Sequence, residues 1–106
     1  MSDDIFDRLI ARIEVGRNGD PATSYVAKMM AKGRAKLAQK VGEEAVETVI
    51  AAMGKDRAEL VGEASDLMFH LALLLADAGL KFDDIRAELA RREGVSGLVE
   101  KANRKG

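Results

Sequence analysis

The stretch LMFHLALLLA, residues 67–76, decides the fold class, because it is apolar on almost every side of a helix. A helix of that kind is normally buried on most of its faces. The stretch contains a histidine and has about half the length that a bilayer span requires, so we expect a core helix and no membrane segment. The rest of the chain is rich in Ala, Leu, Glu, Lys and Arg and has one proline. The sequence therefore predicts an all-α protein.

Start and stop signals divide the chain into about five helices joined by short connections. We expect these helices over residues 3–15, 24–32, 34–53, 56–78 and 83–93. The expected starts are the capping side chains of Ser24 and Asp56 and, for the fifth helix, Asp83 as its first residue. The expected stops are Gly16, Gly33, Gly54, Gly79 and Gly94. Short connections predict a compact antiparallel helical bundle.

Length and composition bound the function. A chain of 106 residues is one domain, residues 1–106, here with a basic C-terminal tail over residues 94–106. So short a chain has a modest core, which favours a homodimer.

The net charge is −1, so the overall charge of the chain does not indicate nucleic acid or an anionic membrane as a partner. The chain has no cysteine, and its first residues, MSDDIFDRLI, lack the features of a secretory signal, so we expect a cytoplasmic protein.

An acidic stripe marks the expected third helix. Glu43, Glu44 and Glu47 fall within an arc of about 100° that also contains Lys40, opposite a small and aliphatic face. A stripe of this composition is usually a solvated helix face. The alternative is one half of a cation site, and this helix alone does not decide between the two.

The apolar fourth helix favours the cation site. It places Glu63, Asp66 and His70 within about 60° of one another on a helix that is expected to be buried. Burying unpaired carboxylates is costly unless a cation or hydrogen-bond donors compensate. Two acidic helices packed antiparallel across the turn GKD, residues 54–56, would form a cage of four carboxylates. Oxygen ligands without cysteine favour a hard cation, Mg²⁺ or Mn²⁺, over zinc.

A di-iron centre is the rival metal site for a helical bundle. Such centres use a Glu-x-x-His motif from each of two helices. Here the motif is Glu63-x-x-Asp66, and His70 is the only histidine of the chain. The composition and spacing therefore disfavour di-iron chemistry.

Several blocks of the sequence resemble a known enzyme family. Glu43-Glu44-x-x-Glu47 followed by Glu63-x-x-Asp66 resembles the EExxE…ExxD signature of the all-α, MazG-like NTP pyrophosphatases, which act on nucleotides through Mg²⁺. Flanking blocks narrow the resemblance to the phosphoribosyl-ATP pyrophosphohydrolase family of histidine biosynthesis. These blocks are SYVAKMMAKG (24–33), KVGEEAVETV (40–49), EASDLMFHLALLLADAGL (63–80) and SGLVEKANRKG (96–106).

The resemblance implies a site and a reaction. It implies that Glu44, Glu47, Glu63 and Asp66 are the metal ligands. Glu43 is then a ligand of the outer coordination shell or orients the attacking water, so Glu43, Glu44 and Glu47 are the catalytic candidates. The implied reaction is the hydrolysis of phosphoribosyl-ATP to phosphoribosyl-AMP and pyrophosphate. The cation would neutralise phosphate oxygens, and a carboxylate would accept the proton of the water.

A small-molecule nucleotide with three phosphates needs further positive charge. The candidate lysines recur at i, i+4 spacing, and they are Lys28, Lys32, Lys36 and Lys40. Lys40 is the best phosphate candidate because it borders the acidic stripe. A solvated lysine face is the ordinary alternative.

Tyr25 and His70 complete the candidates for substrate binding. Tyr25 stacks on the substrate, forms a hydrogen bond with it, or belongs to the packing. His70 contacts a phosphate, braces Asp66 one turn away, or is a satisfied core histidine.

Two other functions remain open. A pyrophosphatase that removes damaged or non-standard nucleotides fits the same metal site, although the Ser-Tyr and C-terminal blocks favour the histidine-pathway family. A non-catalytic helical interaction module is the alternative outside enzymes. Glu63 and Asp66 within an apolar helix disfavour that module.

Overall fold

The protein folds into α-helices. The computed structural model describes residues 4–94, and this range contains five α-helices and no β-strand. The helices are α1 (Ile5–Arg17), α2 (Tyr25–Ala31), α3 (Arg34–Met53), α4 (Arg57–Asp77) and α5 (Phe82–Arg92). The predicted all-α fold is confirmed, and every expected helix is present. None of these helices is long and apolar enough to cross a membrane.

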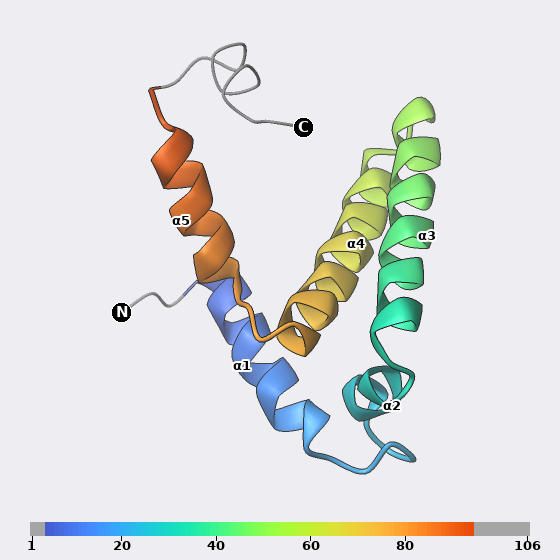
Figure 1. Cartoon of the computed structure of the whole chain (residues 1–106). Coiled ribbons are helices and arrows are strands. Elements are labelled where there is room, and N and C mark those ends of the chain that lie inside the picture. Colours follow the sequence, from blue (N-terminus) through green and yellow to red (C-terminus); the bar gives the residue numbers. More distant parts are fainter. Residues whose placement is uncertain (1–3, 95–106) are drawn as a thin grey trace.

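The long helices α3 and α4 form the hairpin on which the fold is built. They lie side by side and make the most extensive helix–helix contact of the described chain (Figure 1). Their connection, residues 54–56, is so short that the two helices run antiparallel. Asp56 begins α4 as expected, because its carboxylate accepts hydrogen bonds from the backbone N–H groups of Ala58 and Glu59.

The hydrophobic core lies where the second half of α4 and the start of α3 meet α1 and α2. Its buried residues are Ile10, Ile13, Met29, Leu37, Ala72, Leu73, Leu75, Ala76 and Phe82. Four of them belong to the apolar stretch 67–76, which confirms that this stretch is a core helix. Burial of a leucine-sized side chain contributes roughly 1.5–3 kcal/mol, so this end of the hairpin anchors the smaller helices.

Gly16 lies inside α1 and does not end it, so the predicted stop was wrong. The helix begins after Asp4, whose carboxylate accepts the N–H of Asp7, and continues to Arg17. A Cβ atom at residue 16 would lie 3.0 Å from the Cβ of Val26. Glycine at this position therefore lets α2 pack closely on α1, which is a tertiary role that local stop signals do not reveal.

Helix α5 begins one residue earlier than expected. The backbone N–H of Lys81 donates to the carboxylate of Asp84 at 2.9 Å, so Asp84 supplies the capping contact. Asp83, the predicted first residue, is therefore the second residue of the helix. Gly94 follows the helix with a φ of +79°, as is typical of a helix stop. The predicted basic tail, residues 94–106, lies outside the described residues except for Gly94.

Ion pairs and a ring contact hold α5 against α1. Arg86 donates to the carboxylates of Asp4 and Asp7 at 2.7 Å each. Phe82 meets Phe6 edge to face, with ring centroids 5.2 Å apart. Helices α1 and α5 thus form one arm of the molecule, and the α3–α4 hairpin forms the other (Figure 1).

Candidate functional site

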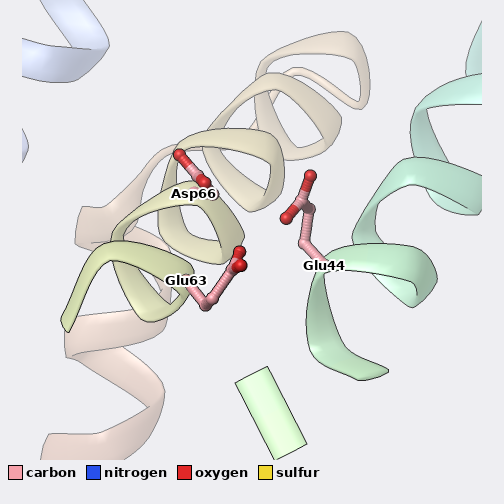
Figure 2. A group of neighbouring side chains, drawn as sticks. All are labelled: Glu44, Glu63 and Asp66. Atoms are coloured by element: carbon pink, nitrogen blue, oxygen red, sulfur yellow. The ribbon is translucent and has the colours of Figure 1, made fainter. Parts of the chain in front are cut away.

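Three carboxylates from α3 and α4 meet between the two helices. Glu44 projects from α3, and Glu63 and Asp66 project from α4 (Figure 2). One oxygen of each side chain lies within 4.8 Å of the others. The hairpin causes this proximity, because opposite positions of an antiparallel pair lie at equal distances from the turn. We call Glu44, Glu63 and Asp66 the acidic triad.

The buried member of the acidic triad is Glu44. Only 7% of its surface is exposed, whereas Glu63 is half-buried and Asp66 is exposed. The expectation that Glu63 and Asp66 are the buried carboxylates was therefore wrong. Both precede Leu67, where the continuous apolar stretch of α4 begins, so they lie outside the most buried part of the helix. The cost of removing charge from water falls instead on Glu44, which needs a cationic partner.

Burial and mutual repulsion raise the pKa of Glu63. Loss of solvation is the largest cause, and the negative charges of Glu47, Asp66 and Glu44 add to it. The effect of Glu47 indicates that its exposed carboxylate lies near Glu63, although Glu47 is outside the acidic triad. All four ligands implied by the family resemblance therefore occupy one region. Such a group of like charges favours the binding of a proton or a cation.

Glu43 is engaged by neighbours on its own helix. The side-chain amide of Gln39 donates to its carboxylate at 2.8 Å, and Lys40 Nζ lies 3.7 Å from it. The hydrogen bond from Gln39, aided by the charges of Lys40 and Lys36, lowers the pKa of Glu43. The hydrogen bond and the nearby positive charges therefore stabilise the charged form of Glu43.

Lys40 is the candidate lysine that contacts the acidic triad. Its Nζ lies 3.7 Å from the carboxylate of Glu44, one helical turn further along α3. Lys36 lies close enough to Glu43 to affect its pKa. Lys28 and Lys32 are exposed, and within residues 4–94 no ion pair joins them to the acidic residues. The structure thus brings two of the four candidate lysines to the site.

Tyr25 and His70 contact each other. The Tyr25 hydroxyl lies 3.2 Å from His70 Nε2, and His70 Nδ1 lies 2.8 Å from the backbone carbonyl oxygen of Asp66. His70 is buried, with 7% of its surface exposed, whereas half of Tyr25 is exposed. His70 is therefore a buried histidine with a partner for each ring nitrogen, and its bond to Asp66 reaches the backbone and not the carboxylate.

Two contacts next to the site were not predicted from the sequence. Gln39 binds the carboxylate of Glu43, and the ring of Phe69 stacks beside Tyr25 with centroids 6.0 Å apart. The i, i+4 spacing of Gln39 and Glu43 was an available signal for the first contact. The second joins α2 to α4 and has no local signal, because it depends on how those helices pack.

The arrangement can hold a hard divalent cation. Carboxylate oxygens are the ligands that Mg²⁺ and Mn²⁺ prefer, and the acidic triad supplies three of them with Glu47 nearby. Mg²⁺ commonly keeps waters and takes further ligands from phosphates. Lys40 adds positive charge beside the triad. The site therefore has the chemistry needed to bind a phosphorylated ligand through a metal ion.

Comparison with known proteins shows close relatives. Residues 6–93 match the protein family described as Phosphoribosyl-ATP pyrophosphohydrolase. A protein of Rhizorhabdus wittichii named phosphoribosyl-ATP pyrophosphatase is 62% identical over 98 residues, which are 92% of each chain. One of the same name from Novosphingobium aromaticivorans is 61% identical over 101 residues, 95% of this chain and 94% of its own. The one from Zymomonas mobilis is 52% identical over 104 residues, 98% of this chain and 97% of its own.

Proposed function

The chain belongs to the phosphoribosyl-ATP pyrophosphohydrolase family, and we propose on this premise that it hydrolyses phosphoribosyl-ATP to phosphoribosyl-AMP and pyrophosphate in histidine biosynthesis. The family match covers most of the chain, and the relatives of that name cover it almost end to end. The structural observation that carries the proposal is the acidic triad, three carboxylates within 4.8 Å on two facing helices. Such a group is unfavourable unless it binds a cation, and a cation there can be shared with a phosphate.

The proposed cofactor is Mg²⁺, with Mn²⁺ as a substitute. Glu44, Glu63 and Asp66 would hold it, with Glu47 as the fourth ligand. The residues fit the ion, because the donors are oxygens only and because loss of solvation, together with their repulsion, already raises the pKa of Glu63. When bound, the ion neutralises charge on phosphate oxygens and lowers the pKa of a coordinated water.

The neighbouring side chains would position the water and the phosphates. Glu43, whose charged form is stabilised, would orient the attacking water by accepting a hydrogen bond. Lys40 and Lys36 would attract the phosphate oxygens of the substrate next to the acidic triad. Lys28 and Lys32, which are both exposed, would add positive charge that attracts the anionic substrate.

The protein would act as a homodimer. Helix α3 exposes a stripe of aliphatic side chains and Met53, with exposed fractions of 59–81%. These residues are Val46, Val49, Ile50 and Met53. A groove of about 380 Å³ also lies between α1 and α4, lined mainly by apolar side chains that include Phe6, Leu9 and Met68. Soluble monomers rarely expose contiguous apolar surface of this extent, so a second copy is the proposed cover.

A net charge of −1 and a site built for a small anionic ligand support a nucleotide substrate and give no reason to propose nucleic acid or a membrane as a partner. The absence of cysteine fits a cytoplasmic location.

A product analysis tests the proposed reaction. The purified protein is incubated with phosphoribosyl-ATP and Mg²⁺, and phosphoribosyl-AMP, pyrophosphate and orthophosphate are quantified by chromatography. We expect equal amounts of phosphoribosyl-AMP and pyrophosphate, and no turnover after divalent ions are removed with EDTA. Release of orthophosphate in place of pyrophosphate, or turnover that persists with EDTA, would contradict the proposal.

A further inference from the structure

Both ring nitrogens of His70 are used within the protein. The carbonyl oxygen of Asp66 can only accept a hydrogen bond, so His70 Nδ1, 2.8 Å away, carries the proton. In the neutral ring Nε2 is then an acceptor, and it receives the hydroxyl hydrogen of Tyr25. Because His70 is also buried, it lacks a free nitrogen and the access needed to contact a phosphate.

The same hydrogen bond determines which part of Tyr25 a ligand can reach. The hydroxyl gives its one hydrogen to His70 and has none left for a phosphate oxygen. The residue nevertheless stays 50% exposed. Phe69 stacks beside it with an angle of 30° between the planes, and the plane of the His70 ring makes an angle of 88° with the Tyr25 ring. Tyr25 therefore presents a fixed aromatic surface rather than a polar group.

Tyr25 lies on the phosphate-binding side of the acidic triad. His70 follows Asp66 by four residues, about 6 Å along α4 in the direction away from the turn. Lys40 is displaced from Glu44 in the same direction along α3, because the two helices are antiparallel. Lys40 and the His70–Tyr25 pair thus both lie beyond the acidic triad on the side away from the turn. A nucleotide whose phosphates contact the triad and Lys40 would therefore have an aromatic surface on that side for its flat base.

We propose that the purine base of the substrate stacks on Tyr25, and that His70 is a positioning residue that holds the Tyr25 ring for this contact. The inference rests on the proposed function for the identity of the substrate. It assigns Tyr25 to the base and not to a phosphate, and it removes His70 from direct contact with the substrate. Stacking of a base on an aromatic side chain gives affinity without depending on hydrogen bonds to the base edge.

The composition of the chain makes this contact directly observable. Tyr25 is the only tyrosine and there is no tryptophan, so the intrinsic ultraviolet fluorescence of the protein comes from Tyr25. AMP, inorganic pyrophosphate and ribose 5-phosphate are titrated separately in the presence of Mg²⁺, with N-acetyltyrosinamide as the control for absorption by adenine. We expect saturable quenching by AMP and little change with the two ligands that lack a base. An equal response to pyrophosphate, or no response to AMP, would overturn the assignment.

Variants separate the ring from its hydroxyl. Tyr25→Ala removes the stacking surface and is expected to raise KM for phosphoribosyl-ATP by roughly 5- to 100-fold, with a smaller change in kcat. Tyr25→Phe keeps the ring and loses only the bond to His70, so it is expected to raise KM less than Tyr25→Ala does and to the same extent as His70→Leu. Equal losses in the two variants would overturn the stacking role. Melting curves confirm that both variants are folded.

A double-mutant cycle tests the role of His70. His70→Leu removes the partner of the hydroxyl and is expected to raise KM and to change the Tyr25 fluorescence in the free protein. Adding Tyr25→Phe to His70→Leu is then expected to have no further effect, whereas additive losses would contradict positioning through Tyr25. If the wild type quenches with AMP but releases no pyrophosphate from phosphoribosyl-ATP, the proposed function fails and the base-binding role of Tyr25 stands.

Discussion

The ammonium group of Lys40 lies 3.7 Å from the carboxylate of Glu44, the buried member of the acidic triad. A buried carboxylate is costly without a cation, and Lys40 supplies that cation within the same helix. A divalent ion bound by Glu44, Glu63 and Asp66 would take over this compensation. Lys40 would then be released from its ion pair and could attract a phosphate at the same place.

Lys40→Gln is expected to lower kcat/KM for phosphoribosyl-ATP by roughly 10- to 100-fold, because a charge-assisted contact to phosphate is lost. Lys55→Gln is the matched control, since Lys55 is an exposed lysine of the connection between α3 and α4 and has no proposed role in the site. The control is expected to stay within about 2-fold, as is typical of surface substitutions. Steady-state kinetics of both variants checks the difference. Equal losses would show that the lysines act through the overall charge of the protein and that Lys40 makes no specific phosphate contact.

Glu44→Gln is expected to lower kcat/KM for pyrophosphate release by at least about 100-fold while leaving the protein helical. The substitution keeps the size of the side chain and removes the charge of a buried ligand. Glu43→Gln is the neighbouring control, because the Glu43 carboxylate is exposed and bound by Gln39. We expect a loss of about 10-fold or less for this variant. Circular dichroism checks the fold, and the larger loss in Glu43→Gln would reverse the proposed roles.

Glu63→Gln is expected to raise the melting temperature of the metal-free protein at pH 7. The pKa of Glu63 is raised in the folded state, so the folded protein binds this proton more tightly than the unfolded chain does. Ionisation of Glu63 therefore destabilises the folded protein when the pH is above the pKa that Glu63 has in the folded state. This destabilisation is lost as the pH falls below that pKa. The gain in melting temperature of Glu63→Gln over the wild type should accordingly shrink between pH 7 and pH 4.

The effect of Mg²⁺ on the melting temperature of the wild type and of Glu63→Gln tests whether Glu63 is a metal ligand. A ligand at a hundred times its Kd stabilises the folded state by about 2.7 kcal/mol, so Mg²⁺ should raise the melting temperature of the wild type by several degrees. Glu63→Gln should show a smaller rise, since it lacks one ligand. A lower melting temperature of the metal-free variant, together with an undiminished response to Mg²⁺, would show that the carboxylates do not form a shared site.

Ile50→Lys is expected to dissociate the homodimer. Ile50 is 64% exposed and lies in the middle of the aliphatic stripe on α3. A lysine on a free surface is normally tolerated, but a charge within an apolar interface is not. Val15→Lys is the control, because Val15 is 77% exposed on the other arm of the molecule. Sedimentation velocity checks the masses, and a wild type that is monomeric at micromolar concentration would contradict the dimer.

Local chemistry explains which parts of the fold were predictable. The bounds of α3 agree with the prediction because glycines flank it, and Gly33 adopts a φ of +90° that favours glycine. Asp56 was likewise found from its capping pattern. Gly16 was misassigned because its role is contact with Val26 of another helix, and no signal within α1 distinguishes that role from a stop.

The site was predictable to the extent that helical periodicity fixed it. Spacing within α3 and α4, together with their short connection, was sufficient to place Glu44, Glu63 and Asp66 together. Burial was predicted for Glu63 and Asp66, whereas Glu44 is the buried residue, because exposure depends on where α1 and α2 cover the hairpin. The bond between Tyr25 and His70 depends on the same packing, so sequence spacing could not predict it.

Comparing pyrophosphate release from phosphoribosyl-ATP, ATP and dUTP, at equal concentrations in the presence of Mg²⁺, determines which nucleotide the protein hydrolyses. We predict that phosphoribosyl-ATP is hydrolysed far faster than the two ordinary nucleotides. Equal or faster hydrolysis of ATP or dUTP would contradict the assignment and would favour a pyrophosphatase that cleans the nucleotide pool.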